Sequence, residues 1–143
     1  MRTADSRIPL TLLMLRLSVF LVMFMWTLDK FIRPEHAAAV FSKFYFISGL
    51  GNTIVYVIGA IQLAIILGFI VGWKKPFTYG AVTFFHAIST FSAFKQYFSP
   101  FEEVNLLFFT AWPMLAACFT LYCLKHLDTY GTLPVASQNA SYQ

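Results

Sequence analysis

The sequence is poor in charged residues, which make up only 11% of its 143 residues. Soluble domains average about 25% charged and about 45–50% apolar residues. Here 59% of the residues are hydrophobic, and the mean hydropathy is +0.69. This shortage of charge excludes an ordinary soluble domain. It predicts an integral membrane protein whose principal partner is the lipid bilayer.

Cysteine is also scarce, because Cys118 and Cys123 are the only two in the chain. On one helix, residues five positions apart point to different faces and do not pair readily with each other. We interpret both as buried free thiols.

The chain also lacks the residue clusters that form catalytic, metal-binding and nucleic-acid-binding sites. Its basic residues give a net charge of +4 but are scattered, so we expect no nucleic-acid partner. We find no metal-ligand set, no glycine-rich phosphate loop and no nucleophile beside a base. Haem is not expected, because one intramembrane histidine offers no second axial ligand at its depth. We therefore assign no catalytic residue and no metal site, and we favour a protein without independent catalytic activity.

What the chain does contain is four apolar stretches, each long enough to cross a bilayer. A hydrocarbon core about 30 Å thick needs about 20 apolar helical residues. We predict spans at about 8–28, 53–73, 77–98 and 104–124. The fold class is therefore an all-α, polytopic membrane four-helix up-down bundle, with the last three helices as antiparallel neighbours. One domain covers residues 1–128, and residues 129–143 form a polar tail that we expect to be disordered.

A longer connection separates the first two spans. Pro34 can occupy the first position of a helix, and residues 37–47 can continue it. Apolar residues recur there at helical spacing, namely Val40, Phe41, Phe44 and Ile47. We predict an amphipathic segment at the membrane interface or dipping back into the bundle.

Two features of the spans concern helix packing. Small residues recur every four positions along the second span, namely Ala60, Ala64, Gly68 and Gly72. Such a face lets another backbone approach closely, either within this chain or from a homo-oligomer or another membrane protein partner. In the fourth span, Pro113 follows Trp112 and predicts a kink, because proline lacks a backbone donor.

Arg16 adds the largest unfavourable free energy of membrane insertion in the chain. An arginine at the centre of a membrane helix costs roughly 2.5–3.5 kcal/mol. No other span has a carboxylate at comparable depth, so Arg16 lacks an obvious internal partner. We hypothesise that it binds an anionic or carbonyl-bearing ligand, such as a quinone head group, a sulfur oxyanion or a lipid phosphate. The alternative is that its side chain snorkels to the interface without any function.

Two further polar residues lie at the midpoints of their spans, Gln62 and His86, and they could complete a ligand-binding pocket with Arg16. Trp112 is assigned to the same pocket. Alternatively, His86 is a hydrogen-bonded packing residue. It belongs to a polar stripe that should face protein or water, formed by Thr83, His86, Thr90 and Tyr97.

The ends of the spans carry other polar groups. Asp29 could pair with Lys30, although solvated charges are the alternative. We assign no role to His36 or His126, which occupy predicted interfacial positions.

The order of features resembles the DoxX-like family of small four-helix membrane proteins. The first span ends in Leu28-Asp29-Lys30-Phe31, where family members commonly have a glycine followed by a Lys-Leu pair. Gln62-Leu63, Gly68 and Gly72-Trp73-Lys74-Lys75 resemble the family's Glu-Leu, glycine-rich helix and basic turn. Trp26 or Thr27 stands where the glycine is usual, and Gln62 replaces the usual glutamate. The likeness in layout covers about residues 15–128.

The resemblance implies a role beside redox enzymes, because some relatives are subunits of membrane sulfur or quinone oxidoreductase systems. We predict an accessory subunit of a membrane redox system, with quinone as the candidate cofactor in a pocket for a quinone-like or anionic ligand. The alternative is a scaffold or assembly protein that docks a partner's transmembrane helix. A small solute carrier is disfavoured, because the chain shows no inverted repeat.

The distribution of basic residues gives an orientation. Four spans place both termini on one side, which carries five basic residues against four on the other, namely Arg2, Arg7, Lys74, Lys75 and Lys125 against Lys30, Arg33, Lys43 and Lys95. We therefore predict cytoplasmic termini, and we expect the membrane to be the bacterial cytoplasmic membrane.

Overall fold

The computed structural model of the protein describes residues 7–134, and all of the secondary structure in this range is helical. The predicted all-α class is thereby confirmed. In chain order the elements are α2 (Arg7–Ile32), α3 (Pro34–Tyr45), α4 (Asn52–Ile70), α5 (Lys75–Ser92), α6 (Phe94–Phe98), the 3₁₀ helix η1 (Asn105–Thr110) and α7 (Ala111–Cys123).

Three helical stretches in the described range are long and apolar enough to cross a membrane, which is compatible with an integral membrane protein. They are α2, α4 and the continuous η1–α7 stretch Asn105–Cys123. The predicted third span divides at Ala93 between α5 and α6, and α5 is not among the three. Thr83, His86 and Thr90 reduce the hydropathy of α5.

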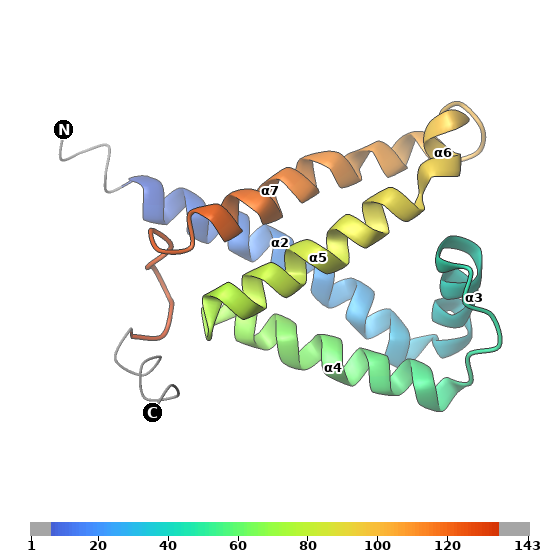
Figure 1. Ribbon diagram of the computed structural model, residues 1–143, viewed down its shortest axis with the longest axis horizontal. Helices are drawn as coiled ribbons and strands as arrows, with labels where there is room; N and C mark the ends of the chain where they lie inside the picture. Colours follow the sequence, from blue (N-terminus) through green and yellow to red (C-terminus); the bar gives the residue numbers. More distant parts are fainter. Residues whose placement is uncertain (1–6, 135–143) are drawn as a thin grey trace.

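The long helices pack in a closed order, in which α2 contacts α4, α4 contacts α5, α5 contacts α7, and α7 returns to α2 (Figure 1). The expectation that the last three long helices are neighbours is confirmed. A shared core lies between them, with Phe69 packed edge-on against Tyr79 at 4.9 Å between ring centroids. Its buried members are Leu12, Val19, Met23, Ile66, Phe69, Tyr79, Val82, Cys118 and Leu121.

The row of small residues on α4 has two different environments. A Cβ on Gly68 would lie 3.0 Å from Cγ2 of Thr78, so this glycine permits close packing against α5. Gly72, just beyond α4, has φ +68°, a conformation that favours glycine. Ala60 and Ala64 are exposed instead. The glycines therefore serve packing within the chain, and the alanines lie on its outer surface.

The predicted connecting helix is present as α3 and begins at Pro34, as expected from the fixed φ and missing N–H of proline. It packs against the C-terminal part of α2 and against α4. Phe44 reaches η1, where its ring lies 5.7 Å from that of Phe108. The helix therefore covers one end of the molecule, opposite the start of α2 (Figure 1).

The predicted fourth span is helical, but its first turns are 3₁₀ rather than α. The 3₁₀ segment ends at Thr110, and α7 begins one residue before Trp112 and Pro113. Proline cannot donate to the carbonyl four residues earlier, so the α-helical hydrogen-bond ladder is interrupted in this region.

Candidate functional sites at the two ends of the helices

Arg16 lies in the third turn of α2 and is only 1% exposed. Its Nη1 atom is 2.8 Å from Oδ1 of Asp128, whose side chain is fully buried. Nη2 donates a hydrogen bond to the carbonyl oxygen of Tyr130. The expectation that Arg16 has no internal carboxylate partner is therefore wrong. The partner comes from the segment after α7, outside all of the predicted spans.

Three more contacts connect this ion pair to α5. The hydroxyl of Tyr79 donates to Oδ2 of Asp128 at 2.6 Å and accepts from Nη1 of Arg16 at 3.4 Å. The ammonium of Lys75 donates to the backbone carbonyl of Asp128 at 2.6 Å. We refer to Arg16, Lys75, Tyr79, Asp128 and Tyr130 as the Arg16 cluster. Within it the guanidinium charge is compensated, and its donors are mostly engaged.

The Arg16 cluster holds the segment that follows α7 against the rest of the molecule. Leu133 donates a backbone hydrogen bond of 2.9 Å to the carbonyl of Val71, in the turn after α4. The segment therefore connects α2, the α4–α5 turn and α5 at the end where α2 starts (Figure 1). These contacts attach the described segment after α7 to the other helices.

The other residues predicted for a pocket with Arg16 have different partners. Nε2 of His86 lies 2.9 Å from the carbonyl of Ala111, which can only accept, so Nε2 carries the proton. The side chain of Gln62 is half-buried and makes no hydrogen bond to a described residue. No hydrogen bond joins either of them to Arg16, and a ligand-binding role for them stays a prediction.

The polar stripe on α5 faces protein, as expected. Thr83 donates to the carbonyl of Cys118 on α7 at 3.1 Å, and Thr90 donates to the carbonyl of His86. Trp112 lies beside the end of this stripe, with its ring 5.6 Å from that of Tyr97 and 5.6 Å from that of Phe91. Trp112 therefore makes aromatic contacts with α5 and α6, and its predicted ligand-binding role stays a prediction.

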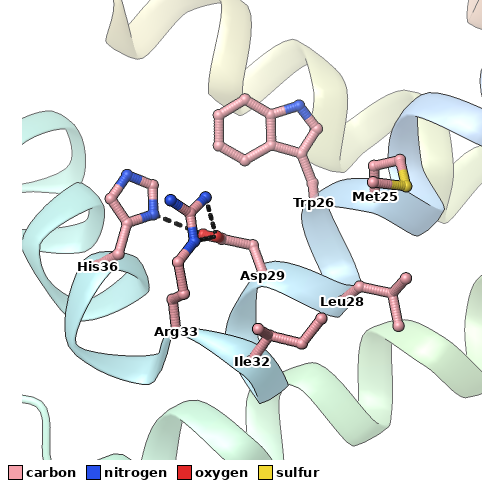
Figure 2. A pocket seen from close by; sticks show the side chains of 7 residues that line it. All are labelled: Met25, Trp26, Leu28, Asp29, Ile32, Arg33 and His36. Carbon is pink, nitrogen blue, oxygen red and sulfur yellow. Dashed lines mark hydrogen bonds and ion pairs between the residues drawn. The ribbon is translucent and has the colours of Figure 1, made fainter.

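A second polar cluster lies at the other end of α2 and consists of Asp29, Arg33 and His36 (Figure 2). Oδ1 of Asp29 accepts from Nε of Arg33 at 2.8 Å and lies 2.5 Å from Nη2. Oδ2 lies 2.7 Å from Nδ1 of His36. The Asp29 side chain is 10% exposed, whereas those of Arg33 and His36 are 62% and 46% exposed. We refer to these three residues as the Asp29 cluster. Its carboxylate is nearly buried, whereas the side chains of Arg33 and His36 are exposed.

The Asp29 cluster borders a hollow of about 310 Å³. The side chains of α2 form its apolar wall, and the polar groups lie where α2 passes into α3 (Figure 2). Its lining consists of Met25, Trp26, Leu28, Asp29, Ile32, Arg33 and His36. A site of this kind can accept a molecule with an apolar body and a polar head.

Sequence reasoning missed this site because it paired Asp29 with Lys30 and gave His36 no role. Lys30 instead donates to the carbonyl of Trp26 at 3.2 Å, and its ammonium lies over the ring of Phe41. The available signal was spacing, because residues four and seven apart share a helix face. Arg33 and His36 stand at those distances from Asp29, provided that the chain stays nearly helical through Pro34.

Comparisons of the chain with protein-family models, with curated proteins and with solved structures found no match.

Proposed function

We propose that the protein is a membrane-embedded four-helix bundle in which α5 crosses the bilayer together with α2, α4 and η1–α7. At 1.5 Å per residue, the 18 residues of α5 extend about 27 Å, close to the hydrocarbon thickness. Its polar stripe hydrogen-bonds to itself and to α7, so its modest hydropathy does not require contact between polar groups and lipid.

We propose that this bundle is an accessory subunit of a membrane redox system and holds a quinone-like molecule in the hollow beside the Asp29 cluster. The observation that carries the proposal is an apolar wall next to a half-exposed set of hydrogen-bonding groups at a helix end. Small-molecule sites combine these two features. The redox context rests on the resemblance to the DoxX-like family.

The charges of the hollow favour a neutral head group over an anionic one. Arg33 is already paired with Asp29, and an incoming anion would be repelled by the same carboxylate. A quinone carries no charge, and its carbonyl oxygens can accept hydrogen bonds from the exposed guanidinium. Of the two ligand classes predicted from the sequence, the quinone-like class therefore fits this location better.

The surface of α2 below the hollow offers a path for an apolar tail. Met14, Leu21 and Met25 are all exposed, at 57–60% of their surface. They lie seven and four residues apart, so they share one face of the helix, and this face leads toward the hollow. A ligand with a polar head and an isoprenoid or alkyl tail matches this succession of surfaces.

Calorimetric titration of the purified protein with a short-tailed benzoquinone in detergent tests the proposal. Ile32→Trp places a large ring in the hollow at a position that is already 72% exposed, so it should block the ligand without unfolding the chain. We expect the affinity to fall at least tenfold. The matched control is Leu106→Trp, at an exposed position on η1, which should leave affinity unchanged. Absence of binding to the unmodified protein, or equal binding to Ile32→Trp, would contradict the proposal.

A second function, docking of a partner's transmembrane helix, is favoured by the exposure of Ala60 and Ala64 on α4. Small residues four apart allow close helix approach in lipid. Arg16 is not available to a partner's carboxylate, because Asp128 already occupies it. Replacing both alanines with leucine should release a stoichiometric partner during purification, whereas Val57→Leu, at a neighbouring exposed position, should retain it. Retention by the double variant would contradict this function.

A further inference from the structure

The tautomer of neutral His36 follows from its contact with Asp29. An ionised carboxylate can only accept hydrogen bonds, and Asp29 already accepts from Arg33. Nδ1 of His36, at 2.7 Å from Oδ2, must therefore carry a hydrogen atom. In the neutral imidazole the other ring nitrogen, Nε2, is then left as a hydrogen-bond acceptor.

Nε2 is available to a ligand. No described residue hydrogen-bonds to this atom, and the His36 side chain is about half exposed at the rim of the hollow. Figure 2 shows the second ring nitrogen on the side of the imidazole away from Asp29. The contact with the carboxylate therefore fixes the ring, and in the neutral imidazole the accepting atom stays open.

The remaining polar side chains around the hollow do not supply an equivalent acceptor. The guanidinium of Arg33 and the indole N–H of Trp26 only donate. The carboxylate of Asp29 is 10% exposed and already engaged on both oxygens. The hollow therefore presents donors from Arg33 and one accessible side-chain acceptor, Nε2 of His36.

We infer that His36, positioned by Asp29, makes the hollow selective for a hydroxyl-bearing head group, a hydroquinone, over the corresponding quinone. This inference rests on the proposed function, because it concerns the same site. A hydroquinone hydroxyl can donate to Nε2 and still accept from Arg33. A quinone has only acceptor oxygens, so one of them facing Nε2 would bring two lone pairs together.

Anaerobic calorimetric titration with a benzoquinone and its hydroquinone, both carrying the same short tail, measures this selectivity. One hydrogen bond is worth a factor of about five to ten in affinity, so we expect the hydroquinone to bind tighter by that factor. His36→Leu should remove the preference by weakening hydroquinone binding alone. The dimethyl ether of the hydroquinone, which has no hydroxyl donor, should bind the unmodified protein no tighter than the quinone.

The possible results separate the inference from the proposed function. Equal affinities for quinone and hydroquinone would overturn the proposed selectivity but would not contradict the proposed ligand site. A preference that persists in His36→Leu would overturn the role of His36. Failure of the unmodified protein to bind either molecule would overturn both the inference and the proposed function.

Discussion

An arginine pairs with an aspartate near each end of α2, but the two pairs have opposite settings. Arg16 and Asp128 are 1% and 0% exposed, whereas Arg33 and Asp29 are 62% and 10% exposed. In the first pair the donors and acceptors are mostly used within the protein, and in the second the cation still faces outward. The comparison shows that burial, rather than residue type, distinguishes an ion pair enclosed within the protein from one that is open to the surface.

Neutralising Asp128 should have the largest effect. Asp128→Asn keeps the size of the side chain but leaves the buried charge of Arg16 uncompensated, which costs about 3–5 kcal/mol in comparable cases. Unfolding in mixed detergent micelles measures the loss. Replacing both residues, with Arg16→Met and Asp128→Leu, should recover most of it, because no buried charge remains. If the double variant were as unstable as the single one, charge compensation would not explain the role of Asp128.

An intermediate effect is expected at Gly72, which lies beside the segment that carries Asp128. In Gly72→Ala the new Cβ would lie 2.7 Å from Thr132, at a backbone φ of +68°, so strain and collision act together. We expect a loss of about 1–3 kcal/mol in the free energy of unfolding.

Substitutions at two other glycines distinguish backbone strain from steric collision as causes of the expected loss at Gly72. Gly49 has φ +77° with no atom within 4 Å of an added Cβ, so Gly49→Ala tests strain alone. Gly51→Ala meets neither problem, so its only expected cost is the loss of a favoured N-cap residue of α4. Equal effects at all three positions would show that the contact between Gly72 and the C-terminal segment has no energetic weight.

The smallest change in stability is expected at the open end. Asp29→Asn removes the charge that pairs with Arg33, but exposed ion pairs contribute about 0–1 kcal/mol. The same micelle titration should therefore show a loss several times smaller than that of Asp128→Asn. A loss as large as that of Asp128→Asn would show that the buried and the exposed ion pair contribute equally to stability.

The sequence predicted the helices better than their polar contacts. Helical spacing and Pro34 were sufficient to place α3, and the polar stripe on α5 was correctly expected to face protein. The partner of Arg16 was not predicted, because no carboxylate lies at a comparable depth within the other predicted spans. Asp128 reaches Arg16 only through a turn after α7, and such a long-range contact leaves no periodic signal in the sequence.

The Asp29 cluster was missed for a different reason. Proline at position 34 marked the start of a new helix, which separated Asp29 from His36 in the interpretation. In the structure α3 begins only two residues after α2 ends, so both side chains meet at the junction. A boundary between two helices can thus conserve the spacing of one continuous helix.

The long sequence separation between Arg16 and Asp128 has a consequence for biosynthesis. The ribosome delivers Arg16 with the first hydrophobic helix, but its counter-charge emerges only after α7 has been made. Until then the cation on α2 lacks its native neutralising group. Formation of this ion pair therefore reports that synthesis has passed α7 and that the segment carrying Asp128 has returned to α2.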